Sequence, residues 1–392
     1  MDGDYLRRVQ SARLGRLLRT FPAVLVCGPR QSGKSTFVRH ELPAWRHLDL
    51  ERPTDHAVLS ADLEGFFDAH PRRLAIDEVQ RMPAVFPALR HVIDRSRANG
   101  RFVLLGSASP PLLRTASETL AGRLGLLELT PFRAVELAGT TWARDRWFWG
   151  GYPRLHRLRG AQSRGEWLDS YVTTFLERDL PSLGLSLPAD RLRVLWTMLT
   201  HVHGNLLNVS DLARSLAVSV HTVNGHLDVL ESTFMIRRLR PYFANTQKRM
   251  TKSPKVYIRD TGLLHFLAGL REGPDLETWS RRGSSFEGLV IEELAGLASD
   301  RLVRPELYFW RTQTGAEVDL LIVSGRRILP IEIKLGAAVD QYAVAGLRQC
   351  MKDLSLKRGW VVCAAREPRL LGRGIEVVPW GDVARGIVDF GF

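Results

Sequence analysis

The chain has 392 residues, of which 45% are hydrophobic and 25% charged, and its formal net charge is +13. This length and composition exclude a disordered chain and predict two or three domains with ordinary cores. The charge predicts a polyanionic partner such as nucleic acid, although arginine greatly outnumbers lysine and such a bias can also reflect genome composition. Where the basic residues cluster is therefore more informative than their number.

The N-terminus and the cysteines argue against several other classes. The segment MDGDYLRRVQSARLG lacks the apolar core of a signal peptide, and no run approaches the roughly 18 apolar residues that a membrane helix needs. Cys27, Cys350 and Cys363 have neither metal-ligand nor redox spacing, so we expect buried thiols, no zinc site and a reducing compartment. These features predict a cytoplasmic protein that does not enter a membrane.

Residues 26 to 36, VCGPRQSGKST, have the glycine spacing of a phosphate-binding loop. An apolar run, FPAVLVCG, leads into the loop and a helical pattern, KSTFVRHEL, follows it, which is the required order. Such a loop turns its backbone N–H groups toward phosphates, while its lysine reaches the β- and γ-phosphates and its serine hydroxyl ligates Mg²⁺. The expected nucleotide-binding residues are Gly28, Pro29, Arg30, Gln31, Ser32, Gly33, Lys34, Ser35 and Thr36, with Lys34 also catalytic and Ser35 also a metal ligand.

An acidic pair follows the next apolar strand pattern. In RRLAIDEVQRMP, the run from Leu74 to Ile76 precedes Asp77 and Glu78. We expect Asp77 to hold the Mg²⁺ shell and Glu78 to orient the attacking water. A third apolar run, RFVLLGSAS at 101 to 109, ends in hydroxyl residues; Ser107 or Ser109 is a candidate sensor of the γ-phosphate, and a plain turn is the alternative.

Together, GPRQSGKS, IDEVQ and GSAS resemble the AAA+ ATPases, and more closely the bacterial and archaeal members whose loop reads GPRQ-x-GK-[ST]. The resemblance implies a parallel sheet between helices, ATP bound between neighbouring subunits of a homo-oligomer such as a hexamer, and an arginine donated in trans. Arg123 is the expected arginine, because it shortly precedes the apolar run LGLLEL. Arg114 is its competitor, and either side chain could equally be a surface charge.

From Pro131 onwards the pattern is helical. The stretch GGYPRL at 150 to 155 predicts a hinge or helix break, and WLDSYVTTFLERDL at 167 to 180 predicts that the helix resumes. The resembled ATPases carry a comparable glycine-glycine-aromatic-proline stretch and a helix ending in LERD, which implies a helical lid or linker over residues 131 to 184.

Residues 205 to 233 have the apolar spacing of a helix-turn-helix. We expect Ser210 to cap a helix ending at Leu216, and Ser219 to cap a second helix from Val220 to Leu230. Four side chains are expected to face out of the second helix, where they could meet DNA: His221, Thr222, Asn224 and His226. Protein contacts are the alternative use of such a module.

A basic run follows, with eight basic residues and no acidic residue between Arg237 and Arg259. A winged helix places a β-hairpin here, and a basic wing binds backbone phosphates without reading bases. The expected DNA-binding residues of the module and the run are His221, Thr222, Asn224, Arg237, Arg238, Lys248, Arg249 and Lys252.

The last third combines an amphipathic helix, FEGLVIEELAG, two strands around Gly315, and a third strand in RRILPIEIKLG. The spacing of Asp319, Glu332 and Lys334 resembles the PD-(D/E)xK nucleases, and Glu287 matches the helix-borne acid of some members. In that chemistry the two acids hold Mg²⁺ and the lysine orients a water or stabilises the pentavalent phosphate. Many proteins on this fold only bind DNA or partners, and a core strand pair with charged ends is a further alternative.

The expected fold class is α/β, and the whole chain resembles AAA-type ATPases with an appended C-terminal domain of unknown function. Our first hypothesis is an ATP- and Mg²⁺-dependent AAA+ motor that remodels duplex or branched DNA, for example by branch migration of junctions. An ATP-gated, Mg²⁺-dependent DNA nuclease and a nucleotide-switched regulatory or protein-binding ATPase are the alternatives. The expected parts are an ATPase core at 1–130, a helical lid or linker at 131–184, a winged helix-turn-helix at 185–275, and a restriction-endonuclease-like domain at 276–392.

Overall fold

The computed structural model describes residues 5–96, 98–107, 118–182, 188–243, 253–339, 344–372 and 374–392. The chain forms two compact units, one built mainly from residues 1–132 and the other mainly from residues 133–392. Five residues named above lie outside the described residues: Ser109, Arg114, Lys248, Arg249 and Lys252. Within the described ranges, no helix combines the length and the apolar character needed to cross a membrane. The division into four parts remains a prediction.

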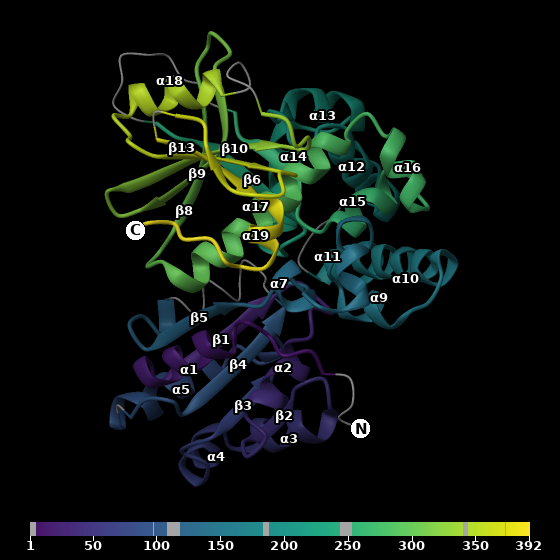
Figure 1. Cartoon of the computed structure of the whole chain (residues 1–392). Helices are drawn as coiled ribbons and strands as arrows, with labels where there is room; N and C mark the ends of the chain where they lie inside the picture. The colour runs from purple at the N-terminus through teal and green to yellow at the C-terminus, as the bar shows by residue number, and fades with distance from the viewer. Residues whose placement is uncertain are drawn as a thin grey trace. The chain divides into compact units, whose positions relative to one another are not determined.

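The first unit contains a five-stranded parallel sheet in the order β2-β3-β4-β1-β5 (Figure 1). Its strands are β1 (Ala23–Gly28), β2 (Arg46–Asp49), β3 (Leu74–Asp77), β4 (Phe102–Ser107) and β5 (Leu124–Glu128). Its helices are α1 (Ser11–Thr20), α2 (Lys34–Glu41), α3 (Pro53–Ala61), α4 (Leu63–Ala69), the short η1 (Val79–Arg81) and α5 (Val85–Arg95). The parallel sheet that the resemblance implied is confirmed.

Both faces of this sheet are buried, as near-continuous apolar strands predict for a parallel sheet. Leu25 packs with α3, α4 and α5 on one face, whereas Val24 and Val26 pack with α1 and α2 on the other. In the strand register, Gly28 lies beside Ser107 and Asp49 lies beside Asp77. The carboxyl ends of the parallel strands therefore meet at one edge, where the phosphate loop and the acidic pair emerge.

The second unit is helical in its first half, as expected from Pro131 onwards. Its helices there are α7 (Ala134–Leu137), η2 (Thr141–Arg144), α8 (Arg146–Trp149), α10 (Ala161–Thr174), the π-helical η3 (Phe175–Asp179), α11 (Leu180–Ser182), α12 (Ala189–His201), α13 (Val209–Leu216) and α14 (Val220–Ser232). The short helix α9 (Pro153–Arg157) begins among residues that group with the first unit. The predicted break at GGYPRL is confirmed, because Gly150 has φ 78° and ends α8.

The expected helix-turn-helix pair is present as α13 and α14, with Ala217 in a left-handed conformation between them. The predicted cap at Ser210 is wrong: the Asn208 side chain accepts hydrogen bonds from the backbone N–H groups of Ser210 and Asp211, so the helix begins two residues earlier, at Val209. The predicted cap of the second helix is confirmed, since Ser219 Oγ accepts from Thr222 N at 3.0 Å.

An eight-stranded sheet in the order β12-β13-β11-β10-β9-β8-β6-β7 forms the other part of the second unit (Figure 1). Its strands are β6 (Ile236–Pro241), β7 (Lys255–Ile258), β8 (Glu306–Arg311), β9 (Glu317–Ser324), β10 (Arg327–Lys334), β11 (Gly359–Cys363), β12 (Arg369–Leu370) and β13 (Ile375–Pro379). The accompanying helices are α15 (Thr261–Leu267), α16 (Gly273–Thr278), α17 (Arg282–Arg301), α18 (Ala345–Asp353) and α19 (Trp380–Ala384). Helix α17 covers one face of the sheet and α18 covers the other.

The expected hairpin of the winged helix is β6 and β7, which pair antiparallel. Strand β6 also pairs in parallel with β8, where Arg240 lies beside Tyr308. The described part of the hairpin is therefore the edge of the C-terminal sheet. The predicted boundary at 275/276 separates β6 and β7 from β8 to β13, although all of these strands belong to one sheet.

Candidate functional site

The phosphate loop joins β1 to α2 and has the backbone conformation that the glycine spacing predicts. Gly28 has φ 155°, and a Cβ there would lie 2.2 Å from the carbonyl oxygen of Leu129. Gly33, with φ 92°, precedes the first residue of α2. Gly28 has no room for a side chain, and Gly33 has a backbone conformation that other residues rarely adopt. The loop that these glycines shape leads into α2, whose N-terminal N–H groups can bind phosphate.

Lys34 lies inside this loop and is buried. Its Nζ donates to the carbonyl oxygens of Gly28 at 3.1 Å and Pro29 at 2.9 Å. Burial lowers the pKa of Lys34, and the nearby carboxylates of Glu78 and Asp77 oppose that shift. The ammonium group is thus held at the mouth of the loop beside the acidic pair.

Ser35 and Asp77 line one small cavity of about 10 Å³ between α2 and the strands β2, β3 and β4, together with Arg39 and His47. A hydroxyl and a carboxylate are oxygen ligands of the kind that Mg²⁺ prefers. These two residues, which the sequence assigned to the metal, therefore fit a Mg²⁺ ion by position and by chemistry.

Glu78 directly follows β3 in a left-handed conformation, with φ 53°. Its backbone N–H donates to Asp77 Oδ1 at 2.9 Å, and its carboxylate accepts a hydrogen bond from the Gln80 side chain. Burial raises the pKa of Glu78, while the hydrogen bond from Gln80 opposes the rise. Gln80 is the last residue of IDEVQ, but the sequence pattern assigned it no role.

Arg8 is a second residue that the sequence did not indicate. Its side chain is buried, and its guanidinium donates to the carbonyl oxygen of Ser32 at 3.0 Å and to that of Thr130 at 2.5 Å. It also lies 4.9 Å from the ring centroid of Phe132. Arg8 therefore ties the phosphate loop to the chain segment after β5, across 24 and 122 residues of sequence.

The two remaining ATPase candidates have different surroundings. Ser107 ends β4 next to Gly28, at the phosphate edge of the sheet. Arg123 precedes β5, at the opposite end of the strands, and its guanidinium binds both carboxylate oxygens of Asp94 at 2.7 and 3.0 Å. Arg123 is therefore separated from the phosphate loop of its own subunit by the length of the sheet.

The expected DNA-facing side chains of α14 are only partly at the surface. His221 is exposed, and Thr222 and Asn224 are half-buried. The prediction that His226 faces out is wrong, because it is 5% exposed and its ring bonds to the carbonyl oxygen of Thr222. The residue lies on the same side of the helix as the core residue Val223, which is its neighbour one turn earlier.

The basic run was expected to present a positive surface to phosphates. This expectation is wrong for most of its described residues, because carboxylates of the same chain balance their charges. Arg237 and Arg259 both bind Glu292 of α17, at 2.5 and 2.9 Å, and Arg238 binds Asp228 and Glu231 of α14 at 2.6 and 2.5 Å. Lys255 is also paired with carboxylates. Arg240 is exposed. The balancing acids come from α14, α17 and β9, all outside the run, so counting charges along it could not reveal them.

The four acidic and basic residues of the C-terminal pattern come together in space. Glu287 lies near the start of α17, Asp319 in β9, and Glu332 with Lys334 in β10. Lys334 Nζ is 2.6 Å from Glu332 Oε1, and Asp319 Oδ2 accepts from the backbone N–H of Ile333 at 2.8 Å. Burial raises the pKa of Glu287 to about 7 and that of Glu332 to about 8, with Asp319 adding to both shifts. The spacing that resembled a nuclease thus predicted a real cluster.

Three further members of this cluster were missed: Lys255 and Tyr257 of β7, and Glu317 of β9. Lys255 Nζ lies 3.1 Å from Glu287 Oε1 and 2.5 Å from Glu317 Oε1. The Tyr257 hydroxyl donates to Glu287 Oε1 at 2.5 Å. In the sequence, Lys255 is one of the eight basic residues of the run, and the pairing of β7 within the hairpin is what buries it.

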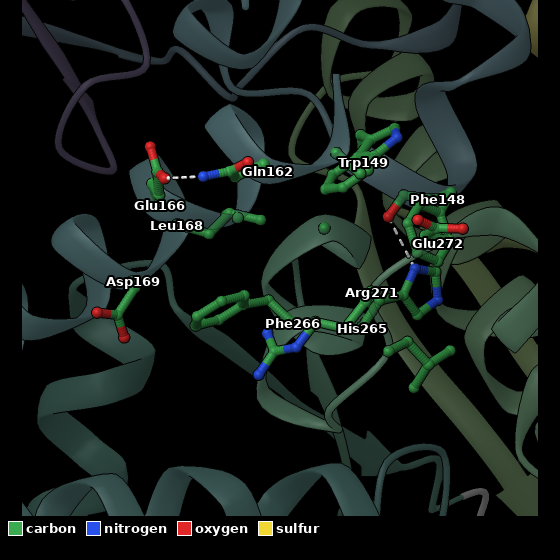
Figure 2. A pocket seen from close by; sticks show the side chains of 14 residues that line it. Phe148, Trp149, Gln162, Glu166, Leu168, Asp169, His265, Phe266, Arg271 and Glu272 are labelled. Carbon is green, nitrogen blue, oxygen red and sulfur yellow. Dashed lines mark hydrogen bonds between the residues drawn. The ribbon is translucent and has the colours of Figure 1, made fainter. Parts of the chain in front are cut away.

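A cavity of about 490 Å³ lies elsewhere in the second unit, between α8, α10, α15 and the turn before α16 (Figure 2). Figure 2 shows Glu166, Leu168 and Asp169 of α10 across the cavity from Phe148 and His265. Aromatic rings and carboxylates thus share its lining. The sequence patterns did not indicate this cavity, because its walls are distant from one another in the chain.

The comparisons with known proteins agree with the geometry of the first unit. A family model described as an AAA domain matches residues 20–138, and two domains of unknown function, DUF8612 and DUF4143, match residues 140–273 and 282–383. The phosphate loop, the acidic pair and the AAA match together define the class: the protein is an ATPase of the P-loop type, with an AAA-like domain.

Two curated relatives place the whole chain in a family. The uncharacterized protein Rv2008c of Mycobacterium tuberculosis and the uncharacterized protein Mb2031c of Mycobacterium bovis are each 42% identical over 387 residues, covering 98% of this chain and 86% of the relative. The chain belongs to the family of these two mycobacterial proteins. Among solved structures, the Walker-type ATPase PABY2304 of Pyrococcus abyssi matches 68% of this chain and 97% of its own length, with 14% identity and a TM-score of 0.47.

Proposed function

We propose that the protein hydrolyses Mg²⁺-ATP at the phosphate loop and uses the cycle to remodel duplex or branched DNA that the second unit engages. The observation that carries the first half is the meeting of Lys34, Asp77 and Glu78 at the carboxyl edge of the parallel sheet. These residues supply the phosphate contact, the metal ligand and the base that phosphoryl transfer to water requires.

The chain's own groups have distinct parts in the hydrolysis. The N–H groups of the loop and the Lys34 ammonium bind the β- and γ-phosphates, after the ammonium leaves the carbonyl oxygens that it now contacts. Glu78 orients the attacking water and accepts its proton; its burial raises its pKa and makes it a stronger base than an exposed carboxylate. Ser35 and Asp77 would hold the Mg²⁺ ion, which would neutralise phosphate charge when bound.

The DNA part of the proposal rests on the helix pair and on the charge. Helix α14 follows a helix-turn-helix geometry and presents His221, with Thr222 and Asn224 beside it, at the surface. Arg240 adds an exposed positive charge on the adjacent strand β6. A net charge of +13 favours a polyanionic partner.

The test is the binding of labelled duplex and four-way junction DNA by the full chain at two salt concentrations. We expect binding that weakens as salt rises, and a loss of about tenfold in affinity for the double variant His221→Ala with Asn224→Ala. Gln162→Ala, which changes an exposed polar residue on α10, should bind as the parent does. Undiminished binding by the double variant would remove α14 from the interface.

A second candidate function is a nucleotide-switched regulator in which the helix pair binds a protein. One observation favours it: Arg237, Arg238 and Arg259 are paired with carboxylates of the same chain and are not available to phosphates without breaking those pairs. The same titration separates the two functions. Absence of salt-sensitive DNA binding by the folded chain, together with ATP hydrolysis that DNA leaves unchanged, selects the regulator.

A further inference from the structure

The resemblance of the C-terminal cluster to a nuclease implies a Mg²⁺ ion held by Asp319 and Glu332, with Glu287 as the helix-borne acid beside them. The structure tests this assignment, because it places a different cation among these side chains. Lys255 Nζ lies 3.1 Å from Glu287 Oε1, 2.5 Å from Glu317 Oε1 and 3.5 Å from Asp319 Oδ1, and the Lys255 side chain is 3% exposed. Three carboxylates from α17 and β9 thus converge on one ammonium group.

The position of Lys255 is fixed by the sheet. Lys255 pairs with Leu239 across the β6–β7 hairpin, and its backbone also forms a β-bridge with Leu206. Two residues further along β7, Tyr257 donates its hydroxyl to the same Glu287 oxygen. Both contacts to Glu287 therefore come from the same side of a paired, buried strand. Such a lysine is part of the sheet and not a mobile surface side chain.

Each carboxylate that the nuclease assignment would place at a metal already has at least one partner within the chain. Glu287 is bound by Lys255 and Tyr257, Asp319 by Lys255 and the N–H of Ile333, and Glu332 Oε1 by Lys334. Among the described residues, Glu332 Oε2 is the cluster's buried carboxylate oxygen without a hydrogen-bond partner. Lys255 and Tyr257 both contact Glu287 Oε1, so a Mg²⁺ ion that used Glu287 Oε2 or Glu332 Oε2 would have the ammonium group of Lys255 or of Lys334 beside it.

Electrostatics leads to the same conclusion. A divalent cation bound by Glu287 and Asp319 would lie within a few ångströms of the Lys255 ammonium, and like charges at that separation repel strongly in a poorly solvated site. Burial alone would lower the pKa of Lys255, but Glu287 and its neighbouring carboxylates raise it well above its usual value. The residues present do not fit the implied metal.

We propose that Lys255 is the built-in cation of this carboxylate cluster, so that the intact chain holds no divalent ion there and does not cleave DNA with it. The cluster instead ties the hairpin strand β7 to α17 and β9 through ion pairs. Removing the ammonium leaves Glu287, Glu317 and Asp319 facing one another without a cation, which is a site that a divalent ion can enter.

The experiment measures Mn²⁺ binding to the full chain without nucleotide, by electron paramagnetic resonance of free and bound Mn²⁺. The parent, Lys255→Met, and Lys255→Met combined with Asp319→Asn are compared; methionine keeps the length of the side chain and removes its charge. We expect Lys255→Met to gain one bound Mn²⁺ with affinity at least about tenfold above the parent, and the added Asp319→Asn to abolish it. Lys255→Arg keeps the charge and should behave as the parent does.

Two results would overturn the proposal. One is a parent chain that binds Mn²⁺ and loses it on Asp319→Asn alone, which would show a metal site that coexists with Lys255. The other is a folded Lys255→Met chain, judged by circular dichroism, that gains no Mn²⁺. If Lys255→Met does not fold, the comparison of the parent with Asp319→Asn decides by itself: equal, weak Mn²⁺ binding by the two supports the proposal.

Discussion

At the residue scale, the phosphate site separates two kinds of contribution to ATP hydrolysis. Lys34 lies on the proposed phosphate-binding loop, whereas Glu78 directly follows β3 and is the residue that we propose to act on the water. Lys34→Ala should therefore weaken nucleotide binding, while Glu78→Gln should retain it and lower kcat by about a hundredfold or more. Nucleotide affinity from a fluorescent ATP analogue, measured beside steady-state ATPase rates, checks the pair. Equal loss of affinity in both variants would contradict these roles.

The ion pair of Glu292 with Arg237 and Arg259 predicts a pH-dependent contribution to stability. Burial alone would raise the pKa of Glu292, but the two guanidinium groups lower it to about 2 from a usual 4.5. Because the folded state has the lower pKa, the stabilisation is complete above about pH 4.5 and is lost as the pH falls toward 2. Glu292→Gln should lower the free energy of unfolding by about 3 kcal/mol at pH 7.

The check is urea unfolding of the parent and Glu292→Gln at pH 7 and near pH 3. The difference between the two chains should be large at pH 7 and much smaller near pH 3. A difference that is the same at both pH values would mean that the carboxylate is not specifically stabilised by its two arginines.

At the element scale, the turn between α13 and α14 contains an avoidable strain. Ala217 is exposed and has φ 52° and ψ 44°, a region that costs an L-residue roughly 1–2 kcal/mol. Ala217→Gly should raise the free energy of unfolding by about 0.5–1 kcal/mol, after allowance for the greater freedom of glycine in the unfolded chain. Ser215→Gly, an exposed position inside α13, is the matched control and should lower it by a similar amount. Thermal midpoints of the two variants test the signs.

Elements with strong local patterns were predictable from the sequence, and their long-range pairing was not. The strand, loop and helix around Lys34 and the acidic pair after β3 follow from apolar runs and glycine spacing. The position of β7 inside the C-terminal sheet depends on the pairing of β6 with β8, some 65 residues further along the chain. For that reason the basic run gave no sign that Lys255 is buried, and it gave no sign of the acids that balance Arg237 and Arg238. Arg8 contacts the phosphate loop through a hydrogen bond to Ser32, 24 residues away in the sequence. No local sequence pattern predicts such a contact.

At the scale of the whole molecule, the proposed trans role of Arg123 requires an oligomer. Arg123 stands at the end of the sheet opposite the phosphate loop, bound to Asp94, so it can meet a bound nucleotide only in a neighbouring subunit. We expect Arg123→Ala to lose hydrolysis while it keeps nucleotide binding. Mixing it with Glu78→Gln should restore part of the activity, because some interfaces then combine an intact Glu78 with an intact Arg123.

Subunit mixing has a direct control in the same chain. Arg123→Ala mixed with a chain that carries both Glu78→Gln and Arg123→Ala has no complete interface and should stay inactive. Full ATPase activity of Arg123→Ala alone would exclude the trans role of this residue and would leave the oligomer without its expected contact.

The central claim is that hydrolysis at the phosphate loop is coupled to DNA held by the second unit. The steady-state ATPase rate of the full chain, measured without DNA and with single-stranded, duplex and four-way junction DNA at two salt concentrations, tests it most directly. We predict a rate that duplex or junction DNA raises, that high salt returns to its basal value, and that Glu78→Gln abolishes. A basal rate that depends on Glu78 but is unchanged by every DNA at low salt would contradict the coupling and leave a P-loop ATPase that serves another partner.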